Sequence, residues 1–600
     1  MTDNPSVTPE RPDAADRTPA APALDRRRVP RNGRIKLHRD PAAIAGRGFD
    51  LVVVGGGAFG AWAAYDAAQR GLSVALLERH DFGAGVSAHA LRTAHARPGG
   101  GGVSPGTLRR RAAERCVLMG VAPHLVQPLA VLAPRYCGGR WTALGMAARQ
   151  ALRAAATLGV GRRLHDPDRR DRWVGAMSAA RLRRTLPELP RHRLAGAEQW
   201  PALQIVYPER LVLALVQSAA CRGAKVLNHA EVDGLLFGEA SDGDAVTGVS
   251  VSDRQSGQSF TVGARVVLNA TGADSGDLLL RGNRPIELPA VAGRDELVLQ
   301  TGRRLVAAGR ALALPGGRDG RELVVAPSGQ GGSLIGPWPL PAGVEPTAAA
   351  RAAAVADCLA AVNRACPAWR LCDDDVDFLS LSRVPIAGPG ASAADVIDHA
   401  ERDGVSGLIS LVGRRYGAAH DAASDALDRV TEALGLPEIS SQTTRVPLMG
   451  GDLPTVVALS AALRVAAADR LETALMDGLL RRHGAHAPAL VRAAIDAGTA
   501  HPVAGTGVMA AELIHAAESE AAETLADAAL RRAGLACWGR FPVDALTAAA
   551  DGLAHARGWN DAERLEQLRR LRAAVAEHAP PGSPAPPPIA SRDVGPEHAA

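Results

Sequence analysis

Aromatic residues, lysine and paired cysteines are scarce in this 600-residue chain, and each scarcity excludes a class of protein. Aromatic residues make up 3% of the sequence and lysine occurs only at Lys36 and Lys225, so arginine carries nearly all of the positive charge behind a net charge of +5. No basic stripe is interleaved with aromatic residues, so the footprint of a nucleic-acid-binding protein is missing. We therefore expect no nucleic-acid partner.

The seven cysteines form no CxxC pair, and no secretory apolar segment precedes them. This arrangement indicates reduced thiols and a cytoplasmic protein rather than a disulfide framework. No group of His, Cys, Asp and Glu has the spacing of a metal site, so no metal is predicted. The acidic run Asp373–Asp375 is interpreted as a solvated turn before a strand. A run of about 18 uncharged apolar residues is also missing, which excludes a membrane-spanning helix.

The chain divides into an α/β part, a helical part and two polar tails. Residues 1–47 are rich in Pro, Ala, Asp and Arg and residues 578–600 are rich in Pro, so both are predicted to be disordered tails. Residues 48–447 alternate strand-like runs with helical stretches, which predicts an α/β fold. Residues 452–577 are mostly Ala, Leu, Arg and Glu at helical spacing and predict an all-helical C-terminal domain.

The segment DLVVVGGGAFGAWAAYDAAQRGLSVALLER, residues 50–79, predicts a strand, a glycine-rich turn, a helix and a second strand. Three glycines have the G-x-G-x-x-G spacing: Gly55, Gly57 and Gly60. The first permits a tight turn, the second lets the backbone approach a pyrophosphate, and the third lets the helix pack on the strand. Ala58 belongs to the same turn, at the helix N-terminus that attracts phosphate, and Glu78 stands where an acid binds ribose hydroxyls. The pattern predicts a dinucleotide site; the alternative is a glycine turn between core elements.

The glycine-rich turn does not choose between NAD and FAD, because both cofactors use it. Residues 264–279, ARVVLNATGADSGDLL, predict a later strand that ends at Thr271 and Gly272. In FAD enzymes with two dinucleotide folds, such a strand returns beside the first nucleotide turn, where small residues let the chain pass close to the cofactor. This strand favours FAD and makes Thr271 and Gly272 predicted cofactor contacts.

Several segments resemble the FAD-dependent glycerol-3-phosphate dehydrogenases of bacteria and mitochondria, over about residues 50–570. LLERHDFGAGVSAHA, residues 76–90, is similar to the family's segment after the second strand, and the match implies that Ser87 contacts the cofactor. Three further segments also resemble the family: ERCVLMGVAPHLVQPLAVLAP, YPERLVLALVQSAACRGAKVLNHAEV and, in the helical part, AESEAAETLADAALRRAGL.

The resemblance implies a fold, a reaction and a location. The implied fold is a Rossmann-like FAD-binding domain with an interleaved α+β substrate domain, followed by the helical domain. The implied reaction is oxidation of sn-glycerol 3-phosphate to dihydroxyacetone phosphate, with hydride passing to the flavin and electrons onward to a quinone. The family's bacterial members contact the membrane peripherally, so a cytoplasmic protein at the inner membrane face is compatible with the sequence.

The segments expected to line the active site depart from the family's pattern. In SAHALRTAHARPGGGG, His95 falls on the family histidine, but the Gly-Gly and Arg-Tyr that should follow are missing. His95 is a candidate to take the alcohol proton, because imidazole titrates near neutral pH, and His420 is a weaker one. The other interpretation of His95 is a structural histidine. LIGPWPL, residues 334–340, lacks the family's acid and contains two prolines.

Arg383 and Arg415 are the candidates for anion binding. Arg383 lies one residue from the family's arginine, and it either clamps a phosphate through its bidentate fork or forms a surface ion pair. In GLISLVGRRYGAAHDAA, residues 407–423, Gly413 is kept beside the flavin and Arg415 replaces the family's lysine. Arg414 replaces a second glycine, so its side chain either crowds the flavin or reaches into the pocket itself.

These observations leave three functions open. The first is an FAD-dependent dehydrogenase acting on glycerol 3-phosphate, and the second is a flavoenzyme of the same fold with another hydroxy or amino substrate. The third is a non-catalytic relative that keeps the fold for binding or assembly and no longer depends on FAD. The intact glycine-rich turn argues against the third, while the altered substrate segments argue against the first. We therefore predict a family-type flavin oxidoreductase acting on a small molecule, a phosphorylated or anionic alcohol.

Overall fold

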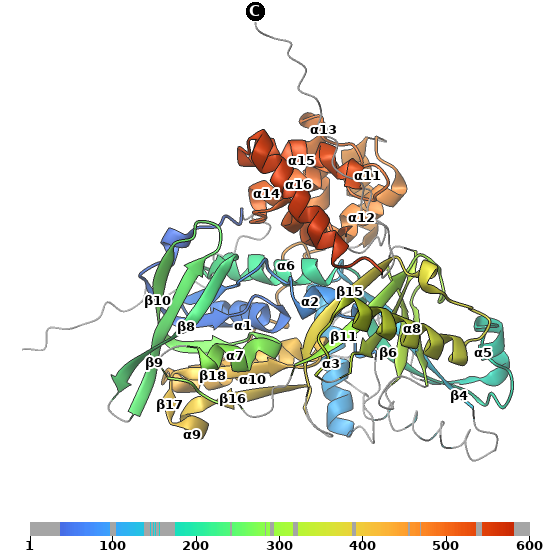
Figure 1. The fold of residues 1–600 in the computed structure, drawn as a ribbon, viewed down its shortest axis with the longest axis horizontal. Helices are drawn as coiled ribbons and strands as arrows, with labels where there is room; N and C mark the ends of the chain where they lie inside the picture. Colours follow the sequence, from blue (N-terminus) through green and yellow to red (C-terminus); the bar gives the residue numbers. More distant parts are fainter. Residues whose placement is uncertain are drawn as a thin grey trace, which may run out of the picture. The chain divides into compact units, whose positions relative to one another are not determined.

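The computed structural model describes residues 36–580 of the chain, which lie within one compact unit. Several stretches inside this range lie outside the described residues: 97–103, 137–174 (four single positions excepted), 241–242, 282–283, 289–292, 316–321, 330, 342, 387–391, 454–455, 469 and 536–542. The described residues form two mixed sheets, the helices that cover them and a separate group of helices (Figure 1).

The first sheet carries the glycine-rich turn at its centre. Its main path runs in the order β16-β18-β10-β1-β2-β7, with these bounds: β16 Ala394–Asp398, β18 Leu408–Gly413, β10 Ser259–Asn269, β1 Gly48–Val54, β2 Val74–Leu77 and β7 Lys225–Leu227. β1 is parallel to both neighbours, and its apolar run is buried on both faces, as expected for a parallel strand between helices. The helix α1 (Ala58–Gln69) crosses from β1 to β2 and packs with α6 (Pro208–Ala220) and α10 (Ala419–Ala433) in one core.

A long hairpin extends the first sheet beyond this path. The strands β8 (Ala230–Ala240) and β9 (Gly243–Asp253) are antiparallel, β9 pairs with the first half of β10, and the short β17 (Val405–Ser406) pairs with β9. The helices α7 (Ser275–Leu280) and α9 (His399–Asp403) belong to the same part of the fold.

The second sheet is built from chain segments that alternate with those of the first. Its order is β15-β11-β14-β13-β12-β4-β6-β3, with β5 on β6, and the bounds are β15 Phe378–Pro385, β11 Gly293–Thr301, β14 Ser333–Pro339, β13 Leu323–Pro327, β12 Arg310–Leu314, β4 Val126–Arg135, β6 Gly196–Ile205, β3 Thr93–Ala94 and β5 Gly175–Ser178. Its neighbours are mostly antiparallel, and α8 (Ala348–Ala365) and α5 (Ala179–Thr185) share a core with it. The predicted α/β fold with an interleaved α+β domain is thereby confirmed. The helix α2 (Val86–His89) lies between β2 of the first sheet and β3 of the second, and α3 (Pro105–Val121) lies between β3 and β4 of the second sheet.

The C-terminal part is helical, as predicted. Its α-helices are α11 Val456–Ala467, α12 Thr473–His483, α13 Ala487–Asp496, α14 Ala510–Ser519, α15 Val543–Arg557 and α16 Asp561–Ala576, with a short π-helix, η9, at Asp527–Arg532. A capping box between Asn560 and Glu563 begins α16, and apolar clusters fill the interior. Among the described helices, none is long and apolar enough to cross a membrane.

The structure describes the inner end of each predicted tail, residues 36–47 and 578–580. Leu37 is buried and forms a bridge with Glu520, and Arg39 pairs with Asp253 at 2.6 Å, so residues 36–47 are ordered. At the other end, the backbone N–H of Leu379 donates to the carbonyl oxygen of His578 at 2.8 Å. These contacts come from distant segments and leave no periodic pattern in the tails. Residues 1–35 and 581–600 lie outside the described residues.

Candidate cofactor and active site

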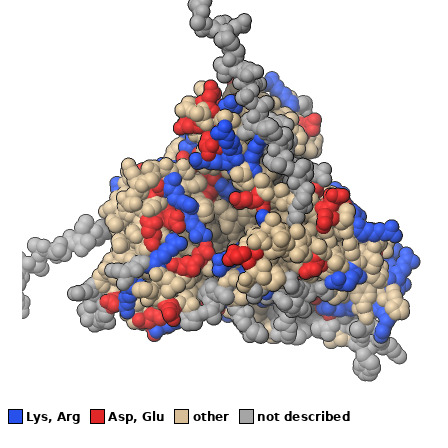
Figure 2. Space-filling model, in the orientation of Figure 1, with Lys and Arg blue, Asp and Glu red and all other residues tan. Residues whose placement is uncertain are grey.

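A cavity of about 2170 Å³ is lined by residues of both sheets. The space-filling view in Figure 2 shows a hollow in this face of the molecule, with acidic and basic side chains at its edge. Eleven of the twelve predicted site residues lie in the cavity wall: Gly55, Gly57, Ala58, Glu78, Ser87, His95, Thr271, Gly272, Arg383, Gly413 and Arg415. Only Gly60 is outside the wall.

Gly55 and Gly60 are required by the packing of the turn itself. Gly55 has a φ of +107°, and a Cβ there would lie 2.6 Å from the carbonyl oxygen of Ala270, where β10 ends. A Cβ on Gly60 would lie 1.9 Å from the carbonyl oxygen of Gly55. Both positions therefore exclude any side chain, and Gly60 holds α1 against β1 without facing the cavity.

Gly57 is different, because little in the protein itself excludes a side chain there. A Cβ on Gly57 would meet only the Ser87 hydroxyl, at 3.3 Å, and the residue faces the cavity. The Ser87 Oγ accepts a hydrogen bond from the Ala58 N–H at 2.9 Å, at the first residue of α1. The bare backbone at Gly57 and the partial positive charge of the α1 N-terminus together fit a pyrophosphate.

The Glu78 carboxylate is fixed at the cavity wall by two backbone donors. Its Oε2 accepts from the Gly56 N–H at 2.6 Å and its Oε1 from the His80 N–H at 2.8 Å. Burial raises the pKa of Glu78, and these hydrogen bonds oppose the rise. Each oxygen keeps a lone pair, so the group fits the two hydroxyls of a ribose.

The end of β10 reaches the same part of the cavity. The Thr271 hydroxyl donates to Asn269 Oδ1 at 2.7 Å, which holds the side chain at the strand end. Gly272 has a φ of +69°, and a Cβ there would have nothing within 4 Å. The structure thus brings Thr271 and Gly272 beside the glycine-rich turn, because β10 and β1 are parallel neighbours.

His95 lies at the wall with one ring nitrogen unused. Its Nε2 is buried and has no hydrogen-bond partner among the residues that the structure describes. Its ring packs under Gly417, whose Cβ would lie 2.8 Å from it. Burial, together with the positive charges of Arg115, Arg111 and Arg415, lowers the pKa of His95 to about 3. The imidazole is therefore neutral and can accept a proton.

The two candidate anion-binding arginines have different surroundings. Arg415 is exposed and acts electrostatically on His95. Arg383 on β15 lies opposite Asp295 on β11, and a Cβ on Gly293 of β11 would come within 2.2 Å of its Nε. The structure therefore places Arg415 with His95 and Arg383 on the wall formed by β11 and β15.

His420, the weaker candidate, is not among the residues that line the cavity. Its Nδ1 lies 2.8 Å from Glu114 Oε1 and its Nε2 lies 2.8 Å from the Thr443 hydroxyl, so both ring nitrogens have partners. Burial alone would lower the pKa of His420, but the interaction with Glu114 outweighs burial and raises it. The Trp62 ring packs edge-on against the imidazole, with ring centroids 4.8 Å apart, and these contacts favour a structural role for the histidine.

The side chain of Arg414, which replaces a family glycine, forms an ion pair with a neighbouring strand. Its Nη2 lies 2.6 Å from Asp395 Oδ2, and Asp395 is on the neighbouring antiparallel strand β16. The guanidinium is turned toward that strand, although Arg414 still forms part of the cavity wall. A Cβ on Gly413 would come within 2.1 Å of the Phe59 ring, so a side chain there would require that ring to move.

Sequence reasoning missed two sets of residues at the cavity. Arg110 and Arg111 of α3 lie in its wall, and the run of three arginines at 109–111 was the available signal. His89 and His578 also line the cavity with their rings stacked at 4.8 Å, and no spacing pattern links residues so far apart.

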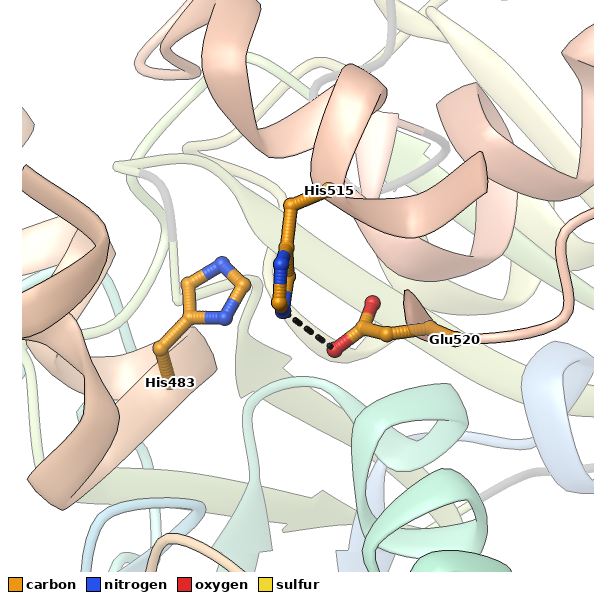
Figure 3. Close-up of side chains that lie close together, drawn as sticks. All are labelled: His483, His515 and Glu520. Carbon is orange, nitrogen blue, oxygen red and sulfur yellow. Dashed lines mark ion pairs between the residues drawn. The ribbon is translucent and has the colours of Figure 1, made fainter. Parts of the chain in front are cut away.

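Two groups of metal-ligating side chains also lie close together, although their spacing did not reveal them. Figure 3 shows His483 and His515 beside Glu520, with Nε2 of His515 3.8 Å from Glu520 Oε1. Arg210 Nη1 lies 2.7 Å from the other oxygen of Glu520, and its Nη2 lies 3.3 Å from His483 Nδ1. The Arg210 guanidinium therefore supplies the positive charge that a metal ion would otherwise bring to these three side chains. The second group is Asp81, His229 and Asp527.

Comparisons with known proteins agree with this architecture. The family described as FAD dependent oxidoreductase matches residues 50–410, and the C-terminal domain of alpha-glycerophosphate oxidase matches residues 441–564. The chain is 28% identical over 559 residues to a glycerol-3-phosphate dehydrogenase of Synechocystis, covering 88% of this chain and 96% of the relative. It is 30% identical over 528 residues to glycerol-3-phosphate dehydrogenase 1 of Mycobacterium bovis, covering 82% and 92%. The solved structure of the glycerol-3-phosphate dehydrogenase from Bacillus halodurans, complexed with FAD, has the same fold, with a TM-score of 0.70, 20% identity and coverage of 90% and 97%.

Proposed function

Because the chain belongs to the family of FAD-dependent glycerol-3-phosphate dehydrogenases, we propose that it oxidises sn-glycerol 3-phosphate to dihydroxyacetone phosphate. FAD, when bound, supplies the acceptor for the hydride that leaves the carbinol carbon. The observation that carries the proposal is the buried His95 ring, whose Nε2 has no partner among the described residues and which lines the same cavity as Arg415 and the glycine-rich turn.

Three features of the first sheet would hold FAD. The bare backbone of Gly57 and the N-terminus of α1 suit the pyrophosphate, and the Glu78 carboxylate suits the ribose hydroxyls. We assign the remaining contacts to cavity-wall residues that the sequence predicted: Gly55, Ala58, Ser87, Thr271, Gly272 and Gly413.

His95 would hold the alcohol proton at Nε2 as hydride leaves the substrate. A pKa near 3 makes an imidazole a weak base at neutral pH, and three arginines contribute to that low value. A bound phosphate would offset the positive charge of Arg415, one of the three, and raise the pKa of His95 toward the working pH. Substrate binding would therefore strengthen the base that the reaction needs.

The substrate class follows from the arginines of the wall. Arg110 and Arg111 enter from α3 and Arg415 follows β18, which makes this side of the cavity suited to an anionic group. Arg383 on β15 is the alternative phosphate clamp. An anionic alcohol of another kind is the second candidate, because the wall supplies charge but few other features specific to glycerol.

We also propose that the reduced flavin passes electrons to a quinone, through peripheral contact with the inner face of the membrane. Support comes from α11, where Val457 and Val465 are 79% and 80% exposed. Such apolar side chains favour an interfacial location. Sedimentation with lipid vesicles tests the contact, and a double Val457→Ser and Val465→Ser variant should reduce it.

An anaerobic visible spectrum, taken before and after addition of glycerol 3-phosphate, tests the function. We expect a flavin spectrum that bleaches with glycerol 3-phosphate but not with glycerol, which lacks the phosphate. A His95→Gln variant should keep the spectrum and bleach slowly. A protein that stays yellow with glycerol 3-phosphate would contradict the proposed substrate and favour another hydroxy or amino compound. A colourless protein that cannot take up FAD would contradict the whole proposal.

A further inference from the structure

Asp81 is a fully buried carboxylate in the loop between β2 and α2, three positions after Glu78. Its Oδ2 accepts from Arg531 Nε at 2.7 Å and its Oδ1 accepts from Arg532 Nη2 at 2.8 Å. Asn228 Nδ2 donates to the same Oδ1 at 2.9 Å. Both arginines belong to η9 of the helical domain, so ion pairs hold the helical domain to a loop of the first sheet.

The two arginines are themselves held firmly. Arg532 Nε and Nη2 donate to the carbonyl oxygen of Glu520 at 3.1 and 3.0 Å. Arg531 also pairs with Asp527, whose other oxygen lies 2.9 Å from Nε2 of His229. A cation bound by Asp81, His229 and Asp527 would face both guanidinium groups, so this group is an ion-pair network and not a metal site.

The loop around Asp81 forms one side of the glycine-rich turn. The Gly83 N–H donates to the Gly56 carbonyl at 3.0 Å, and the Gly56 N–H donates to Glu78 Oε2 at 2.6 Å. The buried Phe82 ring fills the space beside Gly56, where a Cβ would come within 2.8 Å of Phe82 Cδ1. A shift of Asp81 would therefore move Glu78 and the turn together.

We propose that Arg531 and Arg532 are positioning residues for FAD, acting through Asp81 on the loop that carries Glu78. A buried carboxylate is tolerated only with its partners in place, so the loop keeps its position only while η9 is docked. Docking of the helical domain and binding of FAD therefore stabilise each other. This inference depends on FAD binding alone and not on the identity of the substrate.

Titration of the FAD-free protein with FAD, followed by quenching of flavin fluorescence, tests the inference. Arg532→Lys keeps the charge but loses the two-pronged fork, and Asp81→Asn keeps the shape but loses the charge. For each folded variant we expect the Kd for FAD to rise about 5- to 100-fold, the usual range of coupling between two sites. An unchanged Kd in a folded Arg532→Lys protein would overturn the inference.

Arg482→Lys is the matched control. Arg482 is also a fully buried arginine of the helical domain, but among the described residues its side chain bonds to Glu512, Tyr207 and Gly507, none of which contacts Arg531 or Arg532. We expect its FAD affinity to stay within about twofold of the wild type, as for sites that share no partner. A rise as large as that of Arg532→Lys would overturn the inference in favour of a general effect of interface damage.

A second measurement needs no variant. Coupling is reciprocal, so FAD must stabilise the docked helical domain. The residues of η9 do not line the cavity, yet FAD should slow amide hydrogen exchange over Asp527–Arg532 in the wild-type protein. Exchange there that is the same with and without bound FAD would contradict the coupling. Neither measurement involves substrate, so failure of the proposed reaction would leave both results unaffected.

Discussion

Replacing Gly57 by alanine is expected to abolish tight FAD binding while leaving the fold of the FAD-free protein intact. Gly57 has φ −77° and ψ −174°, which alanine adopts without strain. A Cβ there would meet only the Ser87 hydroxyl at 3.3 Å. The gain of about 0.4–1 kcal/mol from a less flexible unfolded chain therefore offsets the tight contact. The free energy of unfolding should change by no more than about 1 kcal/mol.

The effect of Gly57→Ala on FAD should be far larger. The added methyl would stand between the backbone and the pyrophosphate. It would keep the phosphate oxygens too far from the backbone N–H groups, so about two charge-assisted hydrogen bonds would be lost. Each is worth about 1.5–3 kcal/mol, so the loss of about 3–6 kcal/mol raises the Kd by about 100-fold or more. Flavin fluorescence quenching measures the Kd, and thermal unfolding of the FAD-free protein measures stability.

Gly60→Ala is the structural comparison for this prediction. Its Cβ would lie 1.9 Å from the carbonyl oxygen of Gly55, and backbone atoms cannot move aside as a side chain can. We expect this variant to lose about 3 kcal/mol or more of stability even without FAD. Wild-type FAD affinity in a folded Gly57→Ala protein would refute the assignment of the pyrophosphate to this turn.

Three further predictions concern charged residues. Arg383→Ala should weaken apparent affinity for glycerol 3-phosphate by about 1.5–3 kcal/mol in a dye-linked assay, and unchanged affinity would exclude the phosphate clamp. Arg482→Met should lower stability by about 3–5 kcal/mol, because it leaves the buried Glu512 carboxylate without its main partner; thermal unfolding should show partial recovery when Glu512→Gln is added. Burial would raise the pKa of Glu520, but Arg210 outweighs burial and lowers it to about 2, so the helical domain should lose stability as the pH falls from about 4.5 toward 2, and a flat acid profile in circular dichroism would contradict this.

The parts of the site that depend on local backbone geometry could be predicted from the sequence. The spacing of Gly55 and Gly60 is visible because one turn must pass close to one helix and one strand, and the structure shows both contacts. The strands around them are equally visible as short apolar runs. Glu78 was predicted for the same reason, since it ends the second strand at a fixed distance from the turn.

Contacts between distant segments could not be predicted in this way. The contact of His420 with Glu114 could not be predicted, because Glu114 lies 306 positions earlier, on another helix. The order of residues 36–47 depends on Glu520 and Asp253, which no pattern near Leu37 indicates. Side-chain pairs of this kind have no periodicity, because only the completed fold brings them together.

The ion pairs between η9 and Asp81 have a consequence for the order of synthesis, folding and cofactor uptake. Arg532 follows Asp81 by 451 positions, so the loop beside the nucleotide turn leaves the ribosome long before its arginine partners. At roughly 5–20 residues per second, synthesis of the intervening chain takes about 20–90 seconds. Until then the carboxylate has no guanidinium to pair with, and β1 also waits for its parallel neighbour β10. Cofactor uptake is therefore expected to be a late step in the biogenesis of this flavoprotein, well after its nucleotide motif has been translated.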